Sequence, residues 1–117
     1  MKHEKGIAYS TPTGRLVAMP FATDRNPDRW FLGAPIKLFK GQETPTLALL
    51  CENEKTLMDF VIPPGEAAKL VRLLTANSHG QLMFNVARRG EGHFELLVPP
   101  GSAWDISKYL HAHQYLS

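Results

Sequence analysis

The sequence contains only one cysteine, Cys51, so the chain cannot form a disulfide with itself. Long hydrophobic runs are also missing: the longest apolar stretches, such as residues 47–51, fall far short of the roughly 20 residues that a membrane-spanning helix needs. No apolar segment follows the charged first six residues, as it would in a secretory signal. We therefore expect a cytoplasmic protein.

Motifs that carry chemistry are absent as well. The chain has no Gly-x-Ser-x-Gly elbow, phosphate loop, dinucleotide fingerprint or zinc-type Cys/His spacing. His111 and His113 fall in a predicted final helix, where positions two apart point about 200° away from each other and cannot share a metal ion. We predict no catalytic residue, cofactor or metal site, and a protein that is not an enzyme.

The net charge is small, but the charged residues are unevenly distributed along the chain. The net charge is +2, yet residues 1–40 hold seven basic and three acidic groups, while residues 41–117 hold six basic and eight acidic groups. The N-terminal third is therefore the part of the chain to search for an anionic partner. Chance asymmetry in a small protein is an equally good explanation.

The strongest feature that is present is an internal repeat. The segment Ile62-Pro63-Pro64-Gly65 recurs as Val98-Pro99-Pro100-Gly101, 36 residues later. Apolar residues alternate with polar ones before each copy, which predicts a strand with one buried face. Apolar residues at i, i+3, i+4 and i+7 follow the first copy, and the second copy has a similar spacing, which predicts an amphipathic helix after each corner.

These patterns predict an α+β fold in one domain, residues 1–117. A ββα unit over about residues 46–75 (extending to 76) repeats over about 82–111 (81–115 with its flanks). N-terminal strands within residues 6–40 precede both units, beginning with a hairpin whose turn is Thr11-Pro12-Thr13-Gly14. We expect an antiparallel sheet of six to seven strands with two helices on one face, because an isolated hairpin is only marginally stable.

One group of residues suggests a function. Cations alternate with aromatic side chains along a predicted extended segment, and a further pair of arginines occupies a hairpin tip. Bases stack on aromatic faces and phosphates pair with cations in single-stranded nucleic-acid sites. The candidate contacts are Arg25, Arg29, Trp30, Lys37, Phe39, Lys40, Arg88 and Arg89. The competing interpretation places the aromatic rings in the core.

The second predicted unit carries a resemblance. The strand at residues 93–98, followed by Ala103-Trp104-Asp105-Ile106-Ser107-Lys108-Tyr109-Leu110, resembles the strand-to-helix end of a repeat in the Whirly, Pur-alpha and transcriptional-coactivator group. The resemblance covers about residues 46–117. It implies a curved antiparallel sheet repeated about a pseudo-twofold axis, with single-stranded DNA or RNA bound on the sheet face.

Two functions are consistent with these observations. The first is a small non-enzymatic protein that binds single-stranded DNA or RNA through a basic and aromatic sheet face. The alternative is a protein–protein interaction or inhibitor module, of the kind that mobile elements encode. Such a module would form a homodimer or bind a protein partner through an edge strand or through Trp104 and Tyr109.

Overall fold

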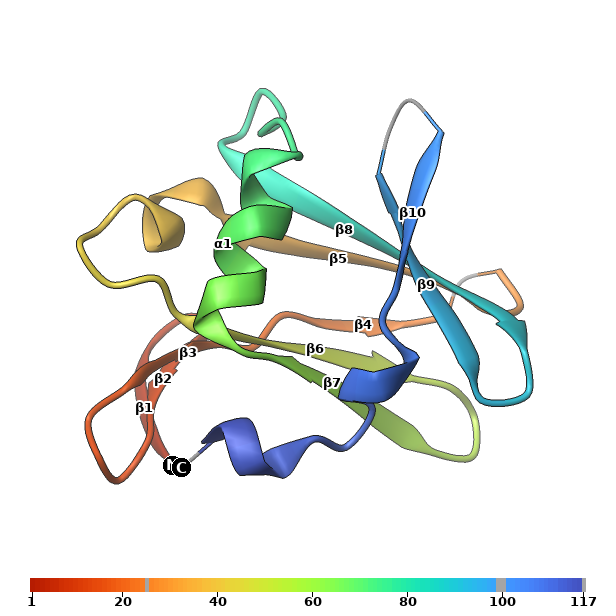
Figure 1. Ribbon diagram of the computed structural model, residues 1–117, viewed down its shortest axis with the longest axis horizontal. Helices are drawn as coiled ribbons and strands as arrows, with labels where there is room; N and C mark the ends of the chain where they lie inside the picture. Colours follow the sequence, from red (N-terminus) through yellow and green to blue (C-terminus); the bar gives the residue numbers. More distant parts are fainter. Residues whose placement is uncertain (25, 99–100, 117) are drawn as a thin grey trace.

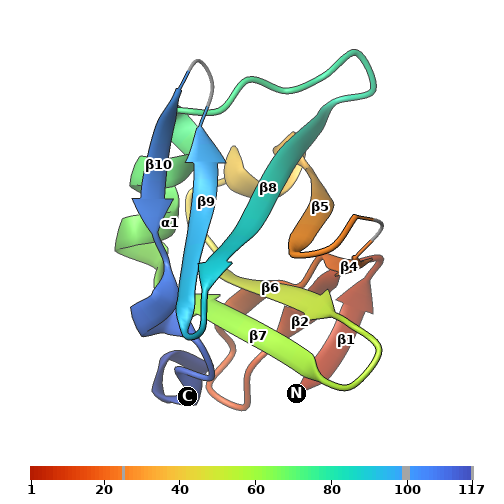
Figure 2. The same ribbon diagram turned by 90° about the vertical axis from the view of Figure 1, so that its right-hand side faces the viewer.

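A computed structural model of the chain describes residues 1–24, 26–98 and 101–116. Its strands lie in two sheets, which Figures 1 and 2 show from two sides. The first sheet is six-stranded and mixed, and the second is four-stranded and antiparallel, in the order β10-β9-β8-β5. In Figure 2, β6 and β7 cross steeply below β8, β9 and β10.

The first sheet is built from short N-terminal strands around one long strand. Its members are β1 (Lys2–Lys5), β2 (Ala8–Ser10), β3 (Leu16–Ala18), β4 (Phe21–Thr23), β6 (Thr46–Glu52) and β7 (Leu57–Ile62). β1, β2 and β3 form an antiparallel meander. β3 and then β4 pair in parallel with successive parts of β6, and β7 pairs with β6 in antiparallel orientation.

The second sheet consists of β5 (Arg29–Pro35), β8 (Gln81–Gly90), β9 (His93–Val98) and β10 (Ser102–Asp105). The single α-helix of the described residues, α1 (Pro64–Arg72), joins β7 to the segment leading into β8. Short 3-10 turns complete the structure: η1 (Ile36–Phe39), η2 (Ser107–Tyr109) and η3 (His113–Leu116).

The core lies between the two sheets and under α1. Alternate residues of β5, β6, β7, β8 and β9 point into it, and Ala67 and Leu70 of α1 are buried with them. Trp30 is only 1% exposed, and its indole Nε1–H donates to the Glu52 carbonyl oxygen at 2.9 Å, linking β5 to β6. The largest fully buried side chains are Trp30, Phe60, Phe84, Leu32, Leu47, Leu49, Ile62, Leu70, Leu82, Leu96, Ile106 and Val17.

Part of the predicted fold is confirmed. The N-terminal hairpin forms as β2 and β3, and the first ββα unit forms as β6, β7 and α1. The β8–β9 hairpin of the second unit also forms, and both Phe60 and Leu96 are fully buried, as their place on the inward faces predicts.

The predicted fold class is nevertheless wrong. The protein is mainly β, with a mixed sheet and a second antiparallel sheet in place of one antiparallel sheet of six to seven strands carrying two helices. The segment 36–39, predicted as strand, is the 3-10 turn η1. β7 occupies one side of β6, and β3 and β4 pair in parallel with the other side.

The predicted repeat fails at its second helix. The chain after the second Pro-Pro-Gly corner forms β10, which pairs back on β9 with Trp104 opposite Leu96. Gly101 has φ +145°, a conformation that only glycine adopts readily, whereas Gly65 does not have positive φ. Good helix formers follow Gly65, but Ser102-Ala103-Trp104-Asp105 favours helix less. An internal repeat of the ββα type is therefore absent from the described residues.

Candidate nucleic-acid interface

The outer face of the β5–β8 ladder carries an exposed aromatic ring. Trp30, Leu32 and Ala34 of β5 point inward, so Arg29, Phe31 and Gly33 point outward. Phe31 lies opposite Asn85 and is 43% exposed. Met83 lies opposite Gly33, the next outward residue of β5, and its Sδ would lie 3.3 Å from a Cβ placed on Gly33.

Arginines gather at one end of this ladder. Arg29 is the first residue of β5 and lies opposite Ala87, the residue before Arg88 and Arg89. Arg88 Nη1 lies 3.9 Å from the carboxylate of Asp28, and the Arg88 N–H donates to the Asp28 carbonyl at 2.9 Å.

Arg88 and Arg89 each have a carboxylate partner, Asp28 and Glu95 respectively. The stronger contact is that of Arg89, whose Nε donates to Glu95 Oε1 at 2.8 Å. Both pairs are accessible to solvent, so each contributes little to stability. In the described part of the chain, Arg29 forms no ion pair.

Lysines occupy the opposite end of the ladder. β5 ends at Pro35 and continues into η1, where Lys37 is exposed, with exposed Lys40 directly after it. The Ile36 N–H donates to the Gly80 carbonyl at 2.9 Å, which ties η1 to the start of β8. Six residues of strand separate the two cationic ends, about 20 Å at roughly 3.4 Å per residue.

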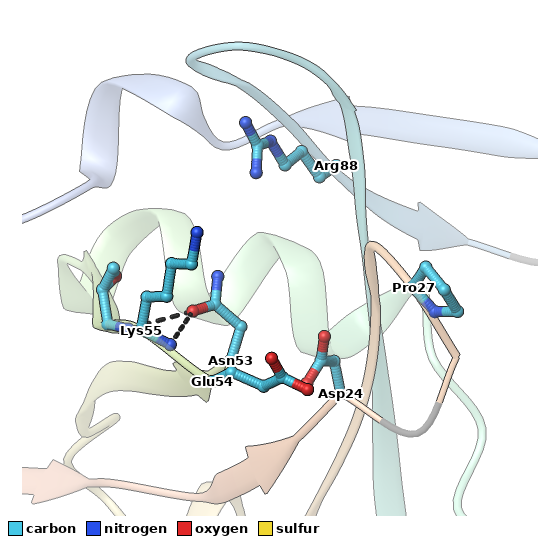
Figure 3. A pocket seen from close by; sticks show the side chains of 7 residues that line it. Asp24, Pro27, Asn53, Glu54, Lys55 and Arg88 are labelled. Carbon is cyan, nitrogen blue, oxygen red and sulfur yellow. Dashed lines mark hydrogen bonds between the residues drawn. The ribbon is translucent and has the colours of Figure 1, made fainter.

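A polar cleft adjoins the arginine end (Figure 3). It has a volume of about 540 Å³ and is lined by Asp24, Pro27, Asn53, Glu54, Lys55, Thr56 and Arg88. Arg88 enters from β8, and Lys55 extends into the same space from the β6–β7 turn. The Asn53 side-chain oxygen accepts from the N–H groups of Lys55 and Thr56, both at 2.9 Å, and this fixes the turn. The cleft mixes both signs of charge.

The structure separates the predicted site residues into three groups. Arg29, Arg88 and Arg89 lie together, and Lys37 and Lys40 lie at the far end of the same ladder. Of the aromatic members, Trp30 is buried in the core, and Phe39 is half-buried and packs against Phe84 with 6.5 Å between ring centroids. Arg25 lies outside the described residues.

Two exposed aromatic residues, Phe21 and Phe31, lie on or beside this ladder and are not among the candidate contacts. Phe31 follows Trp30 on β5 and therefore points outward, but residues 30–32 are all apolar, so the sequence alone does not show which of them faces the core. Phe21 lies on the three-residue strand β4, which is too short for a pattern. Phe21 and Phe31 line one hollow of about 340 Å³ together with Ala22, Thr23 and Asp24.

A second polar cluster lies where the C-terminal segment meets β7. Asp59 accepts hydrogen bonds from both His111 and His113, and the His111 N–H donates to the Asp59 carbonyl at 2.7 Å. Partial burial by itself would raise the pKa of Asp59, but the hydrogen bonds and charges of the two histidines lower it below its usual range. The argument that separated these histidines assumed an α-helix, and residues 107–116 do not form one.

Cys51, the single cysteine of the chain, lies in the core. It is fully buried on β6, and burial raises the pKa of its thiol to about 12. A thiol held protonated in this way is a poor nucleophile. Cys51 is therefore a core residue.

Comparison with known proteins adds no relative. No family, curated protein or solved structure matches this chain. None of the helices in the described residues has the length and hydrophobicity to cross a membrane. Function must therefore be argued from the arrangement of this chain's own residues.

Proposed function

We propose that the protein binds single-stranded DNA or RNA along the outer face of the β5–β8 ladder and has no enzymatic activity. Phe31 supplies the surface on which a base stacks. The arginine end and the lysine end of the ladder contact phosphates on either side of that base. The observation that carries the proposal is an exposed aromatic ring on a strand that has cations at both ends.

The chemistry matches what a single strand presents. Stacking on an aromatic side chain contributes about 1–3 kcal/mol per base and does not depend strongly on sequence. Cations bind phosphates by releasing counterions, so the affinity depends on salt. Arg29, Lys37 and Lys40, which have no carboxylate partner among the described residues, would give a log–log salt slope of about −2, and adding Arg89 would bring it to about −3.

A titration of labelled oligothymidylate and oligouridylate by fluorescence anisotropy tests this proposal. We expect saturable binding that weakens with salt along the slope above. Phe31→Ala and Phe31→Leu should each weaken binding about 5- to 150-fold, because leucine keeps the apolar area but has no aromatic face. Lys37→Ala should weaken binding more than Lys69→Ala, a control that removes the same charge from α1.

Two outcomes would refute the proposal. One is the absence of binding at micromolar protein in low salt. The other is binding whose affinity does not change with salt or is unaffected by Phe31→Ala. Circular dichroism of each variant separates loss of binding from loss of fold.

One observation favours a second function, a protein-interaction or inhibitor module. The exposed Phe21, Phe31 and Met83 form an apolar strip across β4, β5 and β8, and exposed apolar groups of this kind occur at protein interfaces. The surface predicted from Trp104 and Tyr109 is not available, since Tyr109 is buried. Light scattering that shows a homodimer, disrupted by Phe31→Ala but retained in Phe31→Leu and insensitive to salt, would favour this function.

A further inference from the structure

The side chains of Asp59, His111 and His113 converge on one point at the edge of β7. Each offers one donor atom of a type that binds metal ions, and these three atoms lie within 4.8 Å of one another. His113 Nε2 lies 2.5 Å from Asp59 Oδ2, and His111 Nδ1 contacts the other oxygen of the same carboxylate. Two imidazoles and a carboxylate, brought together from segments more than 50 residues apart, form a chelating set.

The backbone holds this set in place. Leu110 forms a bridge with Phe60 on β7, and the next N–H, that of His111, donates to the Asp59 carbonyl at 2.7 Å. His111 has φ +54°, a conformation that is uncommon for a residue with a side chain. Ala112, between the two histidines, is buried, so both imidazoles lie on the outer side of the segment. These contacts orient two histidines that a helix would have separated.

From this geometry we infer that Asp59, His111 and His113 bind a divalent transition-metal ion of the zinc type. The three side chains would occupy three tetrahedral positions, and water would take the fourth. Neutral imidazole nitrogen favours zinc, copper and nickel over the hard cations magnesium and calcium.

The ligands need only a small adjustment to accept the ion. Zinc–nitrogen and zinc–oxygen bonds of about 2.0–2.2 Å in a tetrahedron place neighbouring donors about 3.3 Å apart. The imidazoles must therefore move back from the carboxylate by roughly an ångström. His111 and His113 are 53% and 63% exposed at their side chains, so they can move without disturbing the core, while Asp59, at 19%, stays fixed on β7.

The chain contains a matched control for this site. His93 Nε2 lies 3.7 Å from Glu95 Oε2, and no second histidine of the described residues joins this histidine–carboxylate pair. A pair of ligands should bind zinc much more weakly than a set of three. His93→Gln therefore removes one imidazole from the surface and leaves the proposed site intact.

Isothermal titration with zinc chloride, followed by magnesium chloride in a separate run, tests the inference. We expect one zinc ion per chain, reversed by chelator, and no saturable binding of magnesium. His113→Gln and Asp59→Asn should weaken zinc binding at least tenfold, and His93→Gln should leave it unchanged. The melting temperature, measured for each variant with and without zinc, should rise with zinc in the wild-type protein and in His93→Gln only.

The two results that would overturn the inference are distinct. Absence of saturable zinc binding to the folded wild-type protein would show that the cluster is only a hydrogen-bonded network. Equal zinc affinity in His113→Gln and wild type would place the ion elsewhere. Neither result bears on nucleic-acid binding, because the metal site and the β5–β8 ladder share no residue.

Discussion

The two Pro-Pro-Gly corners allow a comparison in which the local sequence is nearly constant. Gly65 follows its prolines at the start of α1, and Gly101 follows its prolines at the turn from β9 to β10. A Cβ added to either glycine meets no atom within 4 Å, so crowding does not complicate the comparison. Replacing each glycine with alanine should therefore report the backbone conformation alone.

The two substitutions should have opposite signs. Each reduces the freedom of the unfolded chain to a similar degree, which stabilises by about 0.4–1 kcal/mol where alanine fits. Gly65→Ala fits a helix and should increase the free energy of unfolding by about 0.5–1 kcal/mol. Gly101→Ala forces alanine to φ +145° and should lower it by about 1–2 kcal/mol, since strain of about 1–3 kcal/mol exceeds the entropic gain.

Urea unfolding of both variants and the wild type measures the difference between the variants, expected to be about 1.5–3 kcal/mol. In a thermal melt this corresponds to roughly 6–12 °C between the two variants, at about 4 °C per kcal/mol for a domain of this size. The reasoning would be refuted if both substitutions changed stability in the same direction by similar amounts, which is what two equivalent helical corners would give.

Three further predictions concern the core. Cys51 should react with iodoacetamide at pH 8.5 at least about a hundredfold more slowly in the native protein than in urea, because its pKa is raised to about 12 in the folded state. The thiol of the unfolded chain ionises near pH 9. The stabilisation linked to this group is therefore complete below pH 9 and is lost as the pH rises toward 12. Phe60→Ala should cost about 3–5 kcal/mol in urea unfolding, because Phe60 is fully buried and packs edge-on against Phe94 at 5.0 Å, whereas Phe31→Ala should cost far less. Ser107→Ala should cost about 1–3 kcal/mol, because the Ser107 hydroxyl accepts from the Phe94 N–H at 2.8 Å, and equal stability of variant and wild type would contradict this assignment.

Patterns within single elements predicted much of the secondary structure. The strands predicted at residues 46–51, 58–62, 82–87 and 93–98 correspond to β6, β7, β8 and β9, and the alternation before each Pro-Pro-Gly corner falls on β7 and β9. Alternation is a local property that burial of one face imposes on any strand, so it can be read without knowing the partner strand. The same holds for the turn between β2 and β3.

The errors came from relations between distant segments. Nothing local indicates that β3 and β4 pair with β6, which begins more than 20 residues after β4. A helix was predicted after the second Pro-Pro-Gly because the apolar spacing there is similar to that after the first, although the residues after Gly101 favour helix less. The cluster of Asp59, His111 and His113 was not predicted, because the two histidines were placed on a final helix that does not form.

The position of residues 110–113 against β7 has a consequence for association. β7 is an edge of the first sheet, and an uncovered edge offers free N–H and C=O groups to a strand from another molecule. The Leu110–Phe60 bridge and the His111–Asp59 hydrogen bond cover part of that edge with the chain's own C-terminal segment. This segment therefore leaves less of the β7 edge free to pair with a strand of another molecule, and a zinc ion bound to Asp59, His111 and His113 would hold the segment in that position.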